Sequence, residues 1–149
     1  MLPSRYKSSG VSVFIALVAA MLTALSSAPT RAEQLTIDVT GLTKVAGALM
    51  VAVHNSEDSW DDRGEAAALA RQNVTANTAQ LVFVDLAPGT YAVMLYHDEN
   101  ANGELDTNML GVPSEGYGFS NNKGRFGRPS FDEAKIFLTG DLRIEIKIL

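Results

Sequence analysis

Apolar and polar residues alternate along several short stretches of this chain, and turn residues separate these stretches. The clearest alternation runs over residues 35–40 and stops at Gly41. Strict alternation is typical of a β-strand with one buried face. Further strands are predicted at residues 48–53, 81–84, 92–96, 136–138 and 142–148. Six or seven short strands without helical crossovers favour an all-β fold, an antiparallel two-sheet β-sandwich of immunoglobulin-like or prealbumin-like type.

The connections between these strands carry their own signals. The turn at residues 139–141 predicts a hairpin between the last two strands. Pro88 and Gly89 predict a sharp reversal before residue 92, with Gly89 at positive φ. One short helix is predicted at residues 64–72, an Ala-rich stretch of about two turns that must pack on the sheets to be stable. Trp60 precedes it, and we expect its indole to be buried as an anchor.

The N-terminus resembles a secretory signal peptide. A short basic start with Arg5 and Lys7 leads into an apolar run over residues 11–25, and small residues follow. A helix that spans a bilayer needs about 20 apolar residues, so an uncut anchor is the less favoured reading. Cleavage is predicted after Ala28 or Ala32, with the second preferred. This assigns residues 1–32 to the signal peptide and residues 33–149 to a single domain, and it predicts a periplasmic or secreted protein.

Composition narrows the classes of function. Removing residues 1–32 takes away three of the 12 basic residues and none of the 17 acidic ones, so the mature net charge is −8. That charge disfavours nucleic acid or an anionic membrane surface as a partner. The chain has no cysteine, which excludes disulfides, thiol catalysis and thiolate metal sites. Possible partners are another protein, a glycan or a small molecule.

The sharpest candidate site is the oxygen-rich run that follows the strand at residues 92–96. Its spacing is similar to that of a calcium-binding loop, with a turn glycine, Gly103, at the sixth position. The predicted ligands are Asp98, Asn100, Asn102, the main-chain carbonyl of Glu104, and Asp106. The twelfth position, where a bidentate Glu is expected, is Met109, so any calcium site here should be weak unless Glu115 or another group completes it.

The same residues have a second interpretation that needs no ion. Asn and Asp side chains cap their own backbone in Asx-turns, and Asn102-Gly103 favours a tight turn. His97 is a poor calcium ligand, and we expect its imidazole to bond a nearby carbonyl or carboxylate. Both interpretations, the calcium site and the self-capped loop, remain open on the sequence.

A long segment rich in glycine, aromatic residues and amides follows the loop. Segments of this length without periodic structure are often functional. Its aromatic side chains either pack over one end of the sandwich or line a groove for a ligand. The candidate ligand-binding residues are Glu115, Tyr117, Phe119, Asn121, Arg125 and Phe126.

Two resemblances follow from longer motifs. The segment DLAPGTYAV resembles the turn and strand of transthyretin-like and carboxypeptidase-regulatory-type sandwich modules. The combination LAPGTYAVMLY, HDENANGELDTNMLGVPSEGYGFSNN and GRFGRPSFDEA resembles the bacterial secreted family catalogued as domain of unknown function 2141. This second resemblance covers nearly all of residues 33–149. It implies a secreted or periplasmic β-sandwich and no particular activity.

An enzyme is the alternative to a binding module. Asp98, Asp106 and Glu115 could serve as the acid and base of an envelope hydrolase that cleaves glycans or peptides. The sequence has no GxSxG motif and no HExxH motif to support a nucleophilic or zinc-dependent reaction. We therefore predict a non-enzymatic binding or interaction module with a possible weak structural Ca²⁺ site.

Overall fold

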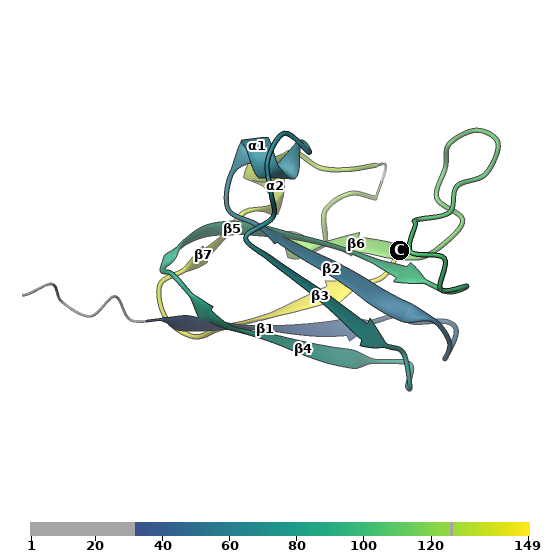
Figure 1. The fold of residues 1–149 in the computed structure, drawn as a ribbon, viewed down its shortest axis with the longest axis horizontal. Helices are drawn as coiled ribbons and strands as arrows, with labels where there is room; N and C mark the ends of the chain where they lie inside the picture. Colours follow the sequence, from purple (N-terminus) through teal and green to yellow (C-terminus); the bar gives the residue numbers. More distant parts are fainter. Residues whose placement is uncertain (1–31, 126) are drawn as a thin grey trace, which may run out of the picture. The chain divides into compact units, whose positions relative to one another are not determined.

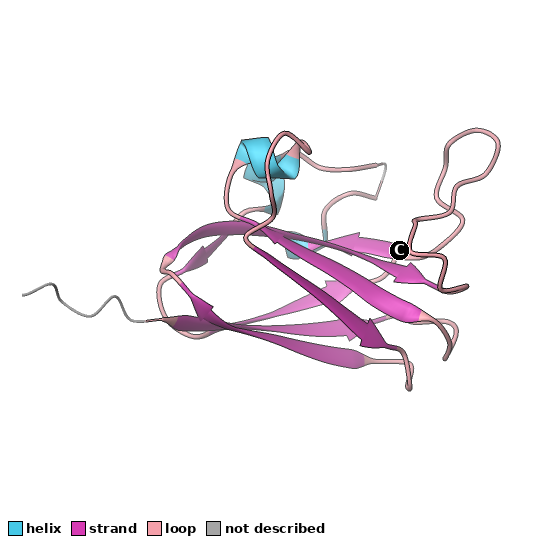
Figure 2. Ribbon diagram, in the orientation of Figure 1, coloured by secondary structure: helices cyan, strands magenta, loops and turns pink. Residues whose placement is uncertain are grey.

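Two sheets of short strands form the fold, as the alternating sequence predicts (Figures 1 and 2). The structure is a computed structural model that describes residues 32–125 and 127–149. The strands are β1 (Glu33–Thr40), β2 (Ala48–His54), β3 (Ala68–Asn73), β4 (Ala79–Leu86), β5 (Gly89–Asp98), β6 (Tyr117–Phe119), β7 (Ile136–Leu138) and β8 (Leu142–Lys147). The short helices are α1 (Glu57–Trp60), the 3₁₀ turn η1 (Ser120–Asn122) and α2 (Phe131–Ala134).

The smaller sheet has the order β4-β1-β8, and the larger has the order β3-β2-β5-β6 with β7 paired to the first residues of β5. Apolar side chains from the facing sides of both sheets form the main core, among them Leu35, Leu49, Val93 and Ile146. Burial of this apolar surface is the principal source of stability for a chain without disulfides. The all-β two-sheet sandwich is confirmed, whereas the likeness to immunoglobulin or prealbumin sandwiches stays a prediction.

A second, smaller core lies on the outer face of the larger sheet. Trp60 is its centre, and Ala92, Phe119 and Ala134 are buried with it. Ser56 caps α1 by accepting a hydrogen bond from the Ser59 amide, and a Ser130–Glu133 capping box begins α2. The two helices cover one end of this face, and among residues 32–125 and 127–149 no helix covers the rest of it. The buried indole agrees with the expected anchoring role of Trp60.

Three sequence predictions about the strands are wrong. The helix predicted at residues 64–72 does not form, because Ala68–Asn73 is the edge strand β3, paired antiparallel with β2. The last two strands do not form a hairpin: β7 pairs with β5, and β8 runs parallel to β1 in the other sheet. The described residues form eight strands rather than six or seven. In each case pairing between distant segments outweighs local propensity and turn signals.

Gly89 also differs from the expectation of positive φ. It begins β5 without a positive φ, and the left-handed residue nearby is Asp85, next to the last residue of β4, with φ 60°. Residues 1–31 of the predicted signal peptide lie outside the described residues. Within the described part of the chain, no helix has the length and apolar character needed to cross a bilayer.

Candidate functional site

The connection between β5 and β6 carries the predicted ion ligands and projects from the sheet, in green in Figure 1. Asp98 ends β5 with only 1% of its surface exposed. Its two carboxylate oxygens accept the backbone N–H groups of Asn102 at 3.0 Å and Gly103 at 2.9 Å. Gly103 has φ 84°, which suits glycine at this turn. Asp98 therefore acts as a cap for its own loop, as the second sequence interpretation predicts.

The other predicted ligands gather around Asp106. The side-chain amides of Asn100 and Asn102 donate to its two oxygens at 2.7 and 3.0 Å. The Asn102 side-chain oxygen accepts from the backbone N–H of Glu104 at 2.8 Å. In residues 32–125 and 127–149, no group of three or more His, Cys, Asp or Glu side chains is arranged to hold a metal ion. Calcium binding by this loop stays a prediction.

Glu115 joins the two ends of the loop. Its carboxylate is buried and accepts the backbone N–H of Glu99 at 2.8 Å and that of Asp106 at 3.0 Å. His97, also buried, places Nε2 2.7 Å from the Ala46 carbonyl oxygen, which confirms the expected carbonyl partner. Buried polar groups paired in this way hold the loop in one arrangement.

Two aromatic residues of the segment after the loop, Tyr117 and Phe119, pack onto the larger sheet. Tyr117 and Phe119 form β6 beside β5, and the Phe119 ring lies 5.9 Å from that of Trp60. Asn121 donates to the carbonyls of Glu133 at 3.1 Å and Lys135 at 2.9 Å, which ties η1 to α2. Of the other candidate ligand-binding residues, Arg125 is exposed and Phe126 lies outside the described residues.

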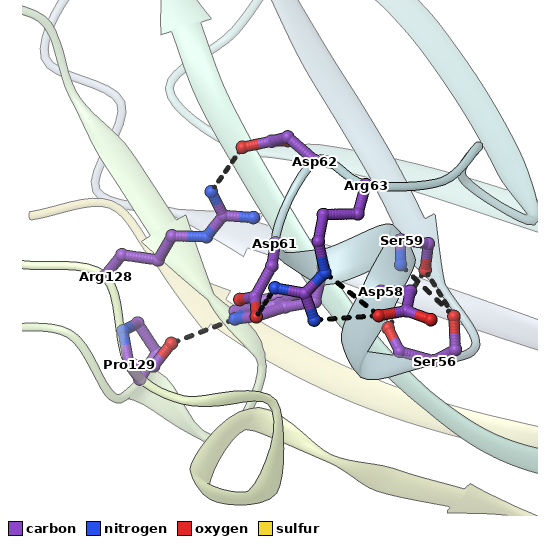
Figure 3. A network of polar contacts seen from close by, with 9 residues as sticks. Ser56, Asp58, Ser59, Asp61, Asp62, Arg63, Arg128 and Pro129 are labelled. Atoms are coloured by element: carbon purple, nitrogen blue, oxygen red, sulfur yellow. Dashed lines mark hydrogen bonds and ion pairs between the residues drawn. The ribbon is translucent and has the colours of Figure 1, made fainter.

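Polar contacts around Trp60 join α1 to the segment before α2, and its indole N–H donates to the Pro129 carbonyl at 3.0 Å. Figure 3 shows the neighbouring ion pairs of Arg128 with Asp62 and of Arg63 with Asp58. The Arg128 guanidinium lies 5.1 Å from the centre of the indole ring and pairs with Asp62 at 2.9 Å. Arg63 pairs with Asp58 at 2.7 Å on the same turn. These contacts connect the segment after α1 to the segment before α2.

A cavity of about 510 Å³ lies on the uncovered part of the outer face. Its floor is formed by outward side chains of β2, β3 and β5, and the turn after α1 forms one wall. A second cavity of about 230 Å³ adjoins it over β5 and β6, sharing Met94 and Tyr96. We call the two cavities together the outer-face groove. Its principal lining residues are Met50, Ala52, His54, Leu69, Arg71, Met94, Tyr96, Leu105, Pro113 and Tyr117.

The acid-rich loop forms part of this groove. Leu105 and Pro113 line the smaller cavity. Tyr96 lines both cavities, and its hydroxyl donates to the Gly103 carbonyl oxygen in the loop at 2.8 Å. Burial raises the pKa of Tyr96, and the charges of Asp98 and Glu115 raise it further, so the hydroxyl keeps the proton that it donates. The loop carboxylates thus support one wall of the groove.

His54 is the least satisfied polar group in the groove. Only 4% of its surface is exposed, and neither ring nitrogen has a hydrogen-bond partner among the residues that the structure describes. Burial lowers the pKa of His54. The Ser59 main chain lies near the ring and raises the pKa by a smaller amount, but it makes no hydrogen bond to either ring nitrogen. The ring packs edge-on against Trp60 at 5.4 Å. At neutral pH the imidazole is therefore uncharged, with a free lone pair.

A family model described as "Uncharacterized protein conserved in bacteria (DUF2141)" matches residues 37–145. The chain belongs to the DUF2141 family. The match extends from β1 to β8, so it includes the acid-rich loop and the outer-face groove. No curated protein and no solved structure matches the chain. The resemblance to this family on sequence motifs is confirmed.

The DUF2141 description gives no activity, so the function must be argued from the site. Asp98 and Glu115 each accept two backbone N–H groups, and Asp106 accepts two side-chain amides. None of these three carboxylates lines either cavity of the groove. Sequence reasoning found the carboxylates and, in Tyr117 and Phe119, part of the lining of the smaller cavity. It missed the larger cavity, because its residues come together only through the register of β2, β3 and β5.

Proposed function

We propose that this DUF2141 protein is an exported, non-enzymatic binding module that takes a small ligand in the outer-face groove. The observation that carries the proposal is the cavity of about 510 Å³ with a mainly apolar floor. Ligand pockets typically enclose about 300 to 1,000 Å³ and combine apolar walls with a few polar groups that orient the ligand. His54, Arg71 and Tyr96 supply such polar groups here.

The character of the lining residues supports a binding role over a simple packing defect. Leu69, at the groove margin, keeps 75% of its surface exposed, although a large apolar side chain gains stability by burial. Met50 and Met94 on the floor are half-buried, and unbranched thioether side chains adapt to the shape of a ligand. A bound molecule would cover apolar surface that the fold leaves open.

Export is part of the same proposal. The basic start, apolar run and small residues at the N-terminus support a periplasmic or secreted location after cleavage following Ala32. The mature net charge of −8 is suited to a neutral or cationic ligand more than to an anionic polymer.

A weak calcium ion in the loop is a second, separate candidate. The sequence spacing of Asp98, Asn100, Asn102 and Asp106 supports it, since these residue types carry the oxygen atoms that calcium prefers. To bind the ion, Asn100 and Asn102 would have to turn their oxygens toward it, because their NH₂ groups now donate to Asp106. Such an ion would stabilise the wall of the groove and take no part in chemistry. The hydrolase alternative has less support, because the loop carboxylates are engaged with backbone and amide N–H groups outside the groove.

Titration with the neutral apolar fluorophore N-phenyl-1-naphthylamine tests the proposal. We expect saturable binding to the native protein at micromolar probe. Ala52→Phe fills the floor of the groove and is expected to weaken binding at least about tenfold, which corresponds to about 1.4 kcal/mol. Val84→Phe, at an exposed position on β4 in the other sheet, is the matched control and should bind like the native protein. Equal binding by both variants, or no binding by the native protein, would contradict the proposal.

A further inference from the structure

We propose that the outer-face groove holds a soft monovalent metal ion, Cu⁺ or Ag⁺, between the thioether sulfurs of Met50 and Met94 and the imidazole of His54. The inference rests on the proposed function, since it names a class of ligand for the same groove. Three features of the site carry it: the strand register, the small residue among the three donors, and the unsatisfied imidazole.

The register of β2 and β5 places the three donors around Ala52, with Met50 and His54 on either side of it along β2 and Met94 across from it. Ala52 lies opposite Met94, Met50 lies opposite Tyr96, and His54 lies opposite Ala92. Met94 is therefore the diagonal neighbour of both Met50 and His54 on the same face. Diagonal neighbours in an antiparallel pair are about 7–8 Å apart, within the reach of long side chains. All three donors line the same cavity.

Ala52 leaves the space that an ion needs. It sits between Met50 and His54 along β2 and directly across from Met94, and it also lines the cavity. A larger side chain at this position would fill the space between the three donors. Met50 and Met94 are both half-buried, so their flexible side chains can turn toward that space at little cost.

His54 supplies the nitrogen donor in the required state. Metal binding needs a neutral imidazole with a free lone pair. Both conditions hold for a buried ring whose nitrogens bond none of the described residues. A buried polar group left unsatisfied costs stability, and a bound ion would satisfy one of the two ring nitrogens.

The donor set selects the class of ion. Thioether sulfur favours Cu⁺, and imidazole also binds copper, whereas calcium and magnesium require oxygen ligands. Zinc sites use thiolate, imidazole and carboxylate, and the described residues hold no such group of three. The shielding of the His54 nitrogens from solvent further disfavours strongly hydrated divalent ions.

Titration of the protein with Ag⁺ in chloride-free buffer, and with Cu⁺ under ascorbate in competition with a chelator, tests the inference. Trp60 is the only tryptophan and its ring contacts that of His54, so its fluorescence reports binding at this site. We expect saturation at one ion per chain and a rise in the thermal midpoint, since the ion binds the folded state. Met50→Leu, Met94→Leu and His54→Gln should each weaken binding at least about tenfold, as loss of a soft ligand predicts. Met109→Leu is the control, because Met109 is fully exposed on the loop and should not contribute.

The leucine variants keep the size and apolar character of methionine, so they separate loss of the donor from loss of the fold. Any of three results would overturn the metal site. They are native-like affinity in Met94→Leu and His54→Gln, a fluorescence response that Met109→Leu abolishes, and no response of the native protein to either ion. If the native protein binds N-phenyl-1-naphthylamine in the groove and binds neither ion, the metal site fails and the proposed function stands. If the probe does not bind, the proposed function itself fails.

Discussion

Asp98→Asn offers the sharpest test of how the acid-rich loop is held. In the native protein the two Asp98 oxygens accept N–H groups from Asn102 and Gly103, at 3.0 and 2.9 Å, in a buried position. Asparagine keeps one acceptor oxygen and turns an NH₂ group toward the other backbone N–H. One hydrogen bond to a charged group is lost, and a shielded N–H is left without an acceptor. Each such change costs about 1–3 kcal/mol, so we expect a loss of about 2–3 kcal/mol in the free energy of unfolding.

Urea denaturation in the presence of a chelator measures this loss without any contribution from a bound ion. For a domain of about 120 residues, 2–3 kcal/mol corresponds to a fall of roughly 8–12 °C in the thermal midpoint. Glu104→Gln is the matched control, because it makes the same change of charge in the same loop on an exposed side chain. Glu104→Gln should change the unfolding free energy by less than about 0.5 kcal/mol. If Asp98→Asn is equally mild in chelator, the carboxylate does not hold the loop as described.

Other predictions concern the ion, His54, Trp60 and Tyr96. Calcium at 10 mM should raise the unfolding free energy of the native protein by about 1.4 kcal/mol for a dissociation constant of about 10⁻³ M, and leave Asp106→Ala unchanged; no shift in the native protein would exclude the calcium site. Burial lowers the pKa of His54, and Arg128 lowers it further, whereas Asp62 raises it, so the unfolded state binds more protons than the folded state. The free energy of unfolding should therefore fall as the pH drops below about 6.5, and should fall less steeply in His54→Gln. Urea denaturation at pH 7.5 and 5.5 measures the difference. Trp60→Phe removes the hydrogen bond to Pro129 and part of the second core, and should cost about 2–3 kcal/mol by urea denaturation, whereas a cost below about 0.5 kcal/mol would contradict its anchoring role. Tyr96→Phe removes the hydrogen bond from the Tyr96 hydroxyl to the Gly103 carbonyl. It should lower the free energy of unfolding by about 1 kcal/mol and weaken binding of the apolar probe. Unchanged probe binding would show that the loop does not support the groove.

Strands with a clear apolar pattern could be predicted from the sequence. The structure of β3 and the pairing of β8 could not, because both depend on the strands that they pair with. β1, β2 and β5 carry apolar runs with turn residues at their ends, and each forms close to its predicted position. β3 is rich in alanine, which favours a helix locally, but the open edge of β2 offers it a full ladder of hydrogen bonds. The parallel pairing of β8 with β1 leaves no local signal, because it joins opposite ends of the domain.

The candidate site divides in the same way. The oxygen-rich loop was evident from spacing alone, yet spacing could not decide between an ion and backbone N–H groups, since both are satisfied by the same oxygen atoms. The aromatic residues Tyr117 and Phe119 indicated the smaller cavity of the outer-face groove, whereas the larger cavity left no sequence signal. β2 is largely apolar on both faces, so its outward side chains Met50 and Ala52 resemble core residues in the sequence. In the structure they line the larger cavity instead.

Mapping of bound N-phenyl-1-naphthylamine by ¹⁵N NMR tests the assignment of the binding site most directly. Addition of the probe to the labelled protein should shift the backbone amide resonances of β2, β3 and β5 beside Met50, Leu69 and Met94, together with those of the loop wall near Leu105. The amides of β4 and β8, in the other sheet, should stay in place. Shifts spread over both sheets, or confined to segments away from the groove, would contradict the proposal that this outer face is the binding site.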